Sequence, residues 1–375
     1  MLLIKPSGSD CNLGCKYCFY KDRAPDVGRG RQRMSYDVLE RLVEDYMKLK
    51  FPFYGFAWQG GEPTLMDLDF YKKVVELQQK HNLSGRQVSN SIQTNAILFD
   101  DKWCRFLNEN KFLAGISIDG PQELHDYYRL DSGGHGTFDK VMQAIELCRE
   151  HNVEFNTLTL INNITAEHPD EIFDFLIDLG IRYMQFITCV EVDDKTGRIA
   201  DFSVSPKQYS KFLCRIFDRW MKFGPQNLSI RNFDSILSYC IGGRHTICTF
   251  DRQCNHYIVI EHTGDVFPCD FFVDPKWRLG NIMETPVEKL AADAAKMDLM
   301  QNKQKLCNKC FACRHLAVCW GGCLKDRIPL DPKNFNCESY FCESYTVFFD
   351  YSRPRFMKLA NQFRSGSLVR PSQLI

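Results

Sequence analysis

The sequence predicts an α/β fold, in which six strand–helix units form a partial (β/α)6 barrel and a small cysteine-rich domain follows. Two observations support this prediction. Short β-rich apolar runs alternate with segments of helical periodicity through the first half of the chain, and ten of the 18 cysteines lie between residues 248 and 342. Strand–helix units in series favour a parallel sheet with right-handed crossovers. The 375 residues are enough for both parts.

Each expected strand is a short run rich in apolar and β-branched residues. The six runs cover residues 2–6, 53–59, 87–94, 112–119, 153–161 and 183–190. The segments between them repeat apolar residues three and four positions apart, which is helical spacing. These segments cover residues 35–49, 67–81, 100–111, 138–151 and 166–180, with Ser35 as the expected N-cap of the first. In such a barrel, the loops at the carboxyl ends of the strands carry the chemistry.

The chain beyond the six units is expected to hold two helices, a hairpin and a terminal helix. Residues 206–241 predict the two helices, residues 263–265 a hairpin turn, and residues 345–363 the last helix. We therefore expect two domains. Residues 1–240 form the partial barrel with its following helices, and residues 241–375 form the cysteine-rich domain with the C-terminal helix.

Composition and charge narrow the function classes. Lys+Arg and Asp+Glu both number 47, so the formal net charge is zero, which does not favour a nucleic-acid or anionic-membrane surface. The N-terminal residues lack the pattern of a secretory signal, and no apolar run approaches the ~18 residues of a membrane span. We therefore expect a cytoplasmic protein with reduced thiols. In that setting, clustered cysteines bind metal or do redox work.

The stretch CNLGCKYCFY places Cys11, Cys15 and Cys18 directly after the first expected strand, in the spacing C-x3-C-x2-C. A structural metal site normally uses four protein ligands, and an open coordination position is typical of a catalytic site. Three thiolates can hold three irons of a [4Fe–4S] cube and leave the fourth iron open to a substrate or cofactor. A zinc knuckle that takes its fourth ligand from elsewhere in the chain is the alternative interpretation.

A second field of cysteines lies toward the C-terminus. Its densest part has the order C-x2-C-x5-C-x3-C, and further cysteines lie upstream and downstream of it. Eight thiolates would fill two [4Fe–4S] clusters, whereas a zinc ribbon is the alternative interpretation. The eight candidates are Cys248, Cys254, Cys269, Cys310, Cys313, Cys319, Cys323 and Cys342.

The first three cysteines, with Tyr17 before the last of them, resemble the signature of the radical S-adenosylmethionine (SAM) enzymes. In that superfamily the amine and carboxylate of SAM chelate the open iron, and reductive cleavage yields a 5′-deoxyadenosyl radical that abstracts a hydrogen atom. The segment QGGEP after the second strand resembles the superfamily's segment that contacts the SAM amine. The resemblance places Arg129 at the SAM carboxylate. Taken together, it implies SAM contacts for Tyr17, Gly60, Gly61, Glu62, Ser117, Asp119, Arg129 and Val190.

The C-terminal cysteines resemble the SPASM extension of peptide-modifying radical SAM enzymes, and the resemblance spans nearly the whole chain. Within that group the chain is similar to the anaerobic sulfatase-maturating enzymes, through the segments IKP, FAWQGGEPTL, SIQTN, SIDGP, VFPCDFF and KWRLGNI in that order. Cys307 and Cys337 offer competing registers. The resemblance implies one auxiliary cluster on Cys248, Cys254, Cys269 and Cys323, and another on Cys310, Cys313, Cys319 and Cys342.

The resemblance also implies a reaction, the oxidation of a cysteine or serine of a sulfatase to Cα-formylglycine. Hydrogen abstraction at Cβ is followed by loss of a proton and of one electron, which passes to the auxiliary clusters. Asp270, next to Cys269, is the implied proton acceptor, and a turn aspartate that caps the hairpin end is the alternative. The implied cofactors are SAM and three [4Fe–4S] clusters, one SAM-binding and two auxiliary.

The implied partners are a sulfatase polypeptide with a C/S-x-P-x-R segment and an electron donor such as ferredoxin or flavodoxin, in an anaerobic cytosol. Two other functions compete. A SPASM-type maturase that forms thioether or C–C crosslinks would share all three clusters, but has less need of an aspartate beside a cluster ligand. A zinc-dependent interaction protein would be colourless, whereas three cubes would give about twelve irons per chain.

Overall fold

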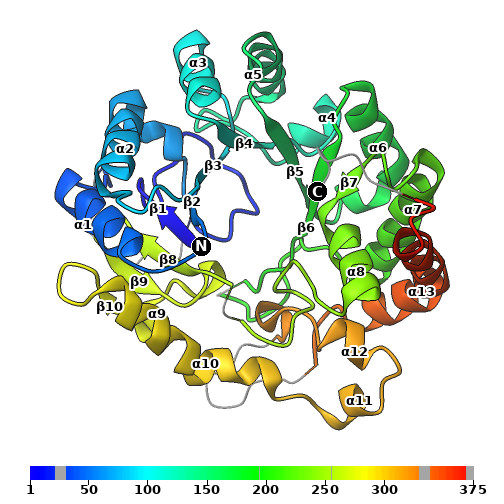
Figure 1. The fold of residues 1–375 in the computed structure, drawn as a ribbon. Helices are drawn as coiled ribbons and strands as arrows, with labels where there is room; N and C mark the ends of the chain where they lie inside the picture. The colour runs from blue at the N-terminus through cyan, green and yellow to red at the C-terminus, as the bar shows by residue number, and fades with distance from the viewer. Residues whose placement is uncertain (22–30, 194, 255, 329–337, 369–375) are drawn as a thin grey trace. The chain divides into compact units, whose positions relative to one another are not determined.

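The computed structural model of the chain describes residues 1–21, 31–193, 195–254, 256–328 and 338–368 (Figure 1). The chain forms two compact units whose segments alternate along the sequence, and each unit is described by itself. The first unit contains residues 1–117, 126–155 and 255–300, and the second contains residues 118–125, 156–254 and 301–375. The domain boundary at residue 240 stays a prediction.

The first unit is built on strands in the order β10-β9-β8-β1-β2-β3-β4. The strands β1 (Leu2–Lys5), β2 (Tyr54–Trp58), β3 (Val88–Thr94) and β4 (Phe112–Ser117) pair in parallel, as the sequence predicts. The helices α1 (Tyr36–Met47), α2 (Asp67–His81), α3 (Asp101–Glu109) and α5 (Phe138–Glu150) connect or flank these strands. The expected N-cap is confirmed, because Ser35 Oγ accepts the Val38 N–H at 3.3 Å.

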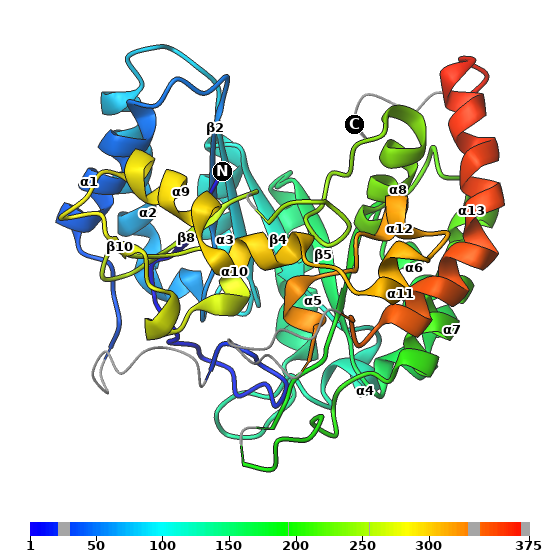
Figure 2. The ribbon, with the colours of Figure 1, turned by 90° about the horizontal axis from the view of Figure 1, so that it is seen from below.

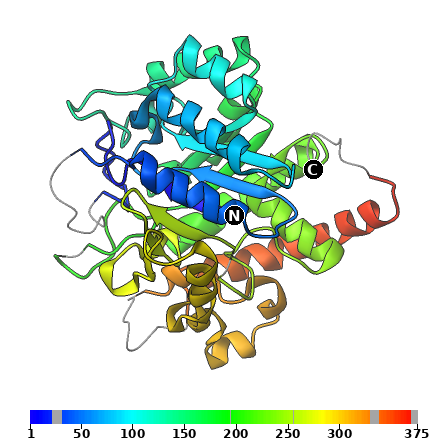
Figure 3. The ribbon, with the colours of Figure 1, turned by 60° about the vertical axis from the view of Figure 1, so that its left-hand side comes forward.

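The predicted hairpin is also confirmed, and it extends the sheet of the first unit. Its strands are β8 (Ile258–Glu261) and β9 (Asp265–Phe267), with the turn at Gly264 in a left-handed conformation, φ +86°. Strand β8 pairs in parallel with β1, beside which it lies in Figure 3, and β9 pairs with β10 (Gly280–Asn281). The helices α9 (Val287–Lys296) and α10 (Asp298–Gln301) follow.

The second unit holds three parallel strands, in the order β5-β6-β7. They are β5 (Phe155–Ile161), β6 (Tyr183–Thr188) and β7 (Ser229–Ile230). The predicted pair of helices after β6 and the predicted terminal helix are all present. The helices of this unit are α4 (Gln122–His125), α6 (Pro169–Asp178), α7 (Pro206–Phe223), α8 (Arg231–Gly242), α11 (Asn308–Phe311), α12 (Leu316–Cys319) and α13 (Cys342–Arg364).

An aromatic core holds α7, α8 and α13 together, and the three helices lie side by side in Figure 2. Phe348 on α13 is 1 % exposed, and its ring centroid lies 5.8 Å from that of Phe217 and 5.6 Å from that of Phe233. Burial of such rings stabilises a helical layer through both the hydrophobic effect and ring contacts. In the part of the chain that the structure describes, no helix is both long enough and apolar enough to cross a membrane.

Phe348→Ala is expected to lower the free energy of unfolding by about 3–5 kcal/mol, because it leaves a cavity between three helices. Urea unfolding, followed by circular dichroism, measures this loss. The matched control is Val347→Ala at the neighbouring position, which is 45 % exposed and should change stability by less than about 0.5 kcal/mol. Equal losses in the two variants would contradict the assignment of this core.

Candidate functional site

The loop after β1 gathers the three cysteines of the C-x3-C-x2-C stretch. The Cys18 N–H donates to the Cys15 carbonyl at 3.2 Å, and the Leu13 N–H donates to Cys11 Sγ at 3.4 Å. Burial, together with the nearby Glu62, Cys15 and Cys18, raises the pKa of Cys11 to about 12. The three thiols therefore lie within electrostatic reach of one another, as ligands of one cluster must.

The loop that carries the two glycines of QGGEP lies directly against the cysteine loop. The Gly61 N–H donates to the Gly8 carbonyl at 2.8 Å, and the Glu62 N–H donates to the Asp10 carbonyl at 2.7 Å. A Cβ atom added to Gly61 would lie only 2.0 Å from the Asp10 carbonyl oxygen. Glycine at position 61 is thus required by a close approach of two backbones.

The Glu62 carboxylate ties the loop after β2 to the loop after β3. It is 1 % exposed, and its oxygens accept from the Thr64 N–H at 3.0 Å, Thr94 Oγ1 at 2.6 Å and the Asn95 N–H at 2.9 Å. Asn95 Nδ2 in turn lies 3.8 Å from Cys11 Sγ. Burial raises the pKa of Glu62, and the hydrogen bonds from Thr64, Thr94 and Asn95 act in the opposite direction.

Three more predicted residues of the first unit lie near this loop or at the end of a strand. Tyr17 is buried, with its ring 5.7 Å from that of Tyr128 and 5.5 Å from the Arg129 guanidinium. The backbone of the same segment holds the cysteine loop, because the Gly14 N–H donates to the Leu130 carbonyl at 2.8 Å. Ser117 ends β4, and its hydroxyl accepts from Gln93 Nε2 at 3.2 Å.

The remaining two predicted SAM contacts, Asp119 and Val190, belong to the second unit. Asp119 is 1 % exposed, and its Oδ1 accepts the Leu160 N–H of β5 at 2.9 Å. Val190 follows β6, and its carbonyl accepts from Lys325 Nζ at 2.7 Å. Both residues lie beyond the carboxyl ends of strands, as the sequence predicts.

Asp270 has a charged and a polar side-chain partner that the sequence alone does not reveal. Its Oδ1 is 2.5 Å from Lys5 Nζ, and its Oδ2 accepts from Gln59 Nε2 at 2.9 Å. Lys5 is 1 % exposed, and its Nζ lies 3.2 Å from the Tyr20 ring centroid, while the Tyr20 hydroxyl donates to Glu261. The ion pair and the amide fix the orientation of a carboxylate that is 13 % exposed.

Neither Lys5 nor Gln59 is among the residues expected at the site from the sequence. The position of each residue in the sequence could have indicated a role at the site. Lys5 is a charged residue at the end of an otherwise apolar strand, and Gln59 ends the second strand run. A lysine in a buried strand needs an anionic partner. That partner comes from residue 270, which is too distant in sequence for a local pattern to indicate.

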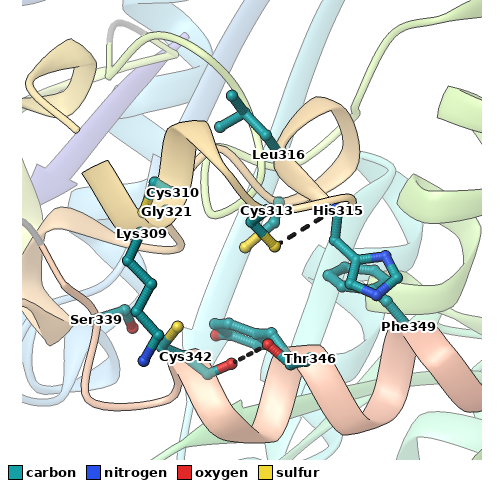
Figure 4. Close-up of a pocket in the computed structure, with 12 residues that line it drawn as sticks. Lys309, Cys310, Cys313, His315, Leu316, Gly321, Ser339, Cys342, Thr346 and Phe349 are labelled. Atoms are coloured by element: carbon teal, nitrogen blue, oxygen red, sulfur yellow. Dashed lines mark hydrogen bonds between the residues drawn. The ribbon is translucent and has the colours of Figure 1, made fainter. Parts of the chain in front are cut away.

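Four predicted cluster ligands of the second unit line one pocket (Figure 4). Cys313 and Cys342 face the space between them from opposite walls, and Cys342 begins α13. Burial raises the pKa of Cys310 to about 12 and that of Cys319 to about 11. The lining residues are Lys309, Cys310, Cys313, His315, Leu316, Cys319, Gly321, Ser339, Cys342, Tyr345, Thr346 and Phe349.

The two cysteines in competing registers have different positions. Cys307 Sγ lies 3.6 Å from Cys310 Sγ, yet Cys307 is not among the residues that line the pocket. Cys337 lies outside the described residues. The pocket therefore fits the C-x2-C-x5-C register that starts at Cys310, with Cys342 as its fourth thiol.

Three of the other four predicted ligands gather around a buried lysine of the second unit. Lys303 is within electrostatic reach of Cys248, Cys254 and Cys323. Burial raises the pKa of Cys254 to about 11, and the Lys303 ammonium acts in the opposite direction. The fourth predicted ligand, Cys269, lies in the first unit, where its Sγ is 3.7 Å from the Tyr257 hydroxyl.

No group of three or more His, Cys, Asp or Glu side chains converges on a single metal ion within the described ranges. The pocket is lined by four thiols, which is the number that one [4Fe–4S] cluster takes.

Two family models match the chain. The model of the radical SAM superfamily matches residues 6–176, and the model of an iron–sulfur cluster-binding domain, SPASM, matches residues 248–314. The first range holds Cys11, Cys15 and Cys18, and the second begins at Cys248.

Relatives match over almost the full chain. A cysteine-type anaerobic sulfatase-maturating enzyme of Clostridium perfringens is 38% identical, over 97% of this chain and 99% of the relative. A serine-type enzyme of Bacteroides thetaiotaomicron is 37% identical, over 98% of this chain and 94% of the relative. A solved structure, native anSMEcpe with bound AdoMet, superposes with a TM-score of 0.90 at 38% identity, over 96% of this chain and 99% of that chain.

Gly61→Ala is expected to lower the free energy of unfolding by about 1–3 kcal/mol or more, because the added methyl group must displace the loop that carries Cys11. Chemical denaturation of the iron-free chain measures the effect. Gly242→Ala is the matched control, since a Cβ there meets no atom within 4 Å. If both variants unfold at the same denaturant concentration, the conclusion that the two loops approach closely at Gly61 is wrong.

Proposed function

Because the chain belongs to the anaerobic sulfatase-maturating enzymes, a family of radical SAM proteins with a SPASM extension, we propose that it oxidises a cysteine or serine of a sulfatase to Cα-formylglycine. The match that carries this proposal covers 97% of the chain and 99% of a relative named a cysteine-type anaerobic sulfatase-maturating enzyme. The match includes both the cysteine loop and the C-terminal cysteine field, so no part of the expected machinery falls outside it.

The residues of the chain fit the cofactors that this reaction needs. When bound, SAM and [4Fe–4S] clusters supply one-electron chemistry that removes a hydrogen atom from an unactivated carbon. Cys11, Cys15 and Cys18 would hold the SAM-binding cluster. One auxiliary cluster would take the four pocket cysteines, which are Cys310, Cys313, Cys319 and Cys342. The other would take Cys248, Cys254, Cys269 and Cys323.

The SAM molecule would lie along the loops that follow the strands. Gly60 and Gly61 bring backbone groups to this edge, while Glu62 holds their loop in place from beneath. Arg129, stacked on Tyr17, presents a cation suited to a carboxylate. Ser117, Asp119 and Val190 complete the proposed set from the ends of their strands.

Asp270 is proposed as the group that removes the substrate proton. A general base must be oriented toward the proton before its pKa matters. Lys5 and Gln59 provide this orientation, since both carboxylate oxygens are contacted within 2.9 Å. Asp270 also follows Cys269 directly, so the proton acceptor lies beside a proposed ligand of the electron-accepting cluster.

The substrate side of the reaction then balances. The target side chain loses one hydrogen atom from Cβ, one proton from its S–H or O–H, and one electron. Serine yields the aldehyde directly, whereas cysteine yields a thioaldehyde that water hydrolyses. We propose a sulfatase polypeptide with a C/S-x-P-x-R segment as the partner, a ferredoxin or flavodoxin as the electron donor, and the cytoplasm as the location, since the reaction requires reduced thiols.

The direct test is anaerobic mass spectrometry with two matched peptides. The reconstituted chain, SAM and a reductant are incubated with peptides that differ only in carrying C-x-P-x-R or S-x-P-x-R. Conversion of the cysteine SH to an aldehyde oxygen, or loss of two hydrogens from the serine, is the expected result. The Cys15→Ala variant is the control and should leave both peptides unchanged.

The outcome also separates the candidate functions. Formation of 5′-deoxyadenosine with both peptides unmodified would reject the sulfatase substrate and favour another peptide maturase. Colourless chain that binds zinc and no sulfide would reject the radical chemistry altogether.

Asp270→Asn is expected to lower formylglycine formation by at least about 10²-fold, because an amide cannot accept the proton, while SAM cleavage persists. Formylglycine and 5′-deoxyadenosine are quantified in the same reaction. The matched control is Asp274→Asn, four residues further along, whose side chain caps a short turn by accepting the Lys276 N–H at 3.0 Å. An Asp270→Asn variant that forms formylglycine at the normal rate would end the assignment.

A further inference from the structure

Lys303 is a buried ammonium group in the cysteine-rich part of the second unit. It lies in the short turn Asn302–Gln304 and is 0 % exposed. Its Nζ donates to the Thr249 carbonyl at 2.9 Å and also to the Gly322 carbonyl. Carbonyl dipoles satisfy two of its N–H groups, and neither partner carries a negative charge.

Other buried lysines of the chain have carboxylate partners. Lys325 Nζ lies 2.7 Å from Glu191, and Lys5 Nζ lies 2.5 Å from Asp270. Among the residues that the structure describes, no ion pair includes Lys303. A buried charge without a close counter-charge destabilises the folded state. The buried Asp326 carboxylate is within electrostatic reach of Lys303 but forms no ion pair with it, so an anion closer to the ammonium would stabilise it.

The surroundings of Lys303 indicate where that anion lies. Thr249 follows Cys248 directly, and Gly322 precedes Cys323 directly, so both carbonyls that hold the ammonium flank proposed cluster ligands. Cys254 and Cys323 exert the strongest attractive electrostatic interactions on it. The lysine thus lies within electrostatic reach of several thiols, as well as of the buried Asp326 carboxylate.

A second buried cation fixes this arrangement. Arg327 is 0 % exposed and donates to the carbonyls of Asn302 at 2.9 Å and of Lys303 at 3.0 Å. Its guanidinium therefore clamps the backbone of the turn that carries Lys303. The charge is held in place, and it is not free to move to solvent.

We propose that Lys303 is the counter-cation of the auxiliary cluster proposed on Cys248, Cys254, Cys269 and Cys323, and that it raises the reduction potential of this cluster. The inference rests on the proposed function. A cube with four thiolates is anionic and gains one more negative charge on reduction, so a fixed nearby cation stabilises the reduced form more than the oxidised form. Lys303 would thereby favour uptake of the electron that leaves the substrate.

The test compares Lys303→Met with Lys305→Met, the same substitution two residues away at an exposed position. Both substitutions are made in the full chain with Cys11, Cys15 and Cys18 replaced by alanine. The measured signals then come from the auxiliary clusters alone. Iron and sulfide are counted, and the midpoint potentials are measured by electron paramagnetic resonance during redox titration. The signal of the other auxiliary cluster is followed in the same titration and should shift less, since only Cys319 among its proposed ligands interacts with Lys303.

The expected result is a lower midpoint potential for one of the two auxiliary signals in Lys303→Met, with both potentials unchanged in Lys305→Met. Unchanged potentials in Lys303→Met would overturn the proposal. If the Lys303→Met variant loses iron, the Lys303→Arg variant is measured as well. Iron retained by the arginine variant supports a requirement for positive charge at this position, whereas iron lost from both variants counts against the proposal. Absence of iron and sulfide from the parent chain would instead reject the proposed function itself.

Discussion

The parallel pairing of β1 with both β2 and β8 is the constraint on which the candidate site of the first unit depends. Parallel strands end at the same edge, so the loops that follow them must meet there. The register places Ile4 opposite both Trp58 and Ile260. The cysteine loop, the glycine loop and the hairpin turn after β8 are consequently delivered to one edge. Asp270 follows β9, which runs antiparallel to β8, and its ion pair with Lys5 joins it to this part of the sheet.

The loops that meet at this edge are then fixed by groups buried within the protein. Glu62 joins two loops through a carboxylate with no access to solvent, and Gly61 allows backbone to lie on backbone. These contacts are short and directional. The exposed faces of the same loops remain available for a cofactor.

Two buried lysines solve the same electrostatic problem in different ways. Lys5 is neutralised by a carboxylate of the polypeptide, which it orients for chemistry. Lys303 donates to carbonyls and forms no ion pair with a described carboxylate, and we propose that a cluster on the nearby thiolates compensates its charge. In both places the cost of burying a charge links the folded structure to the proposed reaction.

Much of this protein follows from the sequence alone. The six strand runs, the helices between them, the Ser35 cap and the Gly264 turn are local patterns, because periodicity and turn chemistry act over a few residues. The resemblance to a family rested on ordered motifs, and the full-length relatives confirm it. The spacing of the cysteines likewise indicated which thiols lie close together in the loop after β1 and in the C-terminal pocket.

Only the tertiary structure decided which distant residues serve those motifs. The pairing of Lys5 with Asp270, the contact of Gln59 with Asp270 and the hydrogen bond of Lys303 to the Thr249 carbonyl join residues far apart in the chain. No periodicity encodes such contacts, since they arise from strand register and loop packing rather than from neighbouring residues. The sequence therefore determined the elements and the chemistry of the ligands, whereas the structure decided how charge is balanced around them.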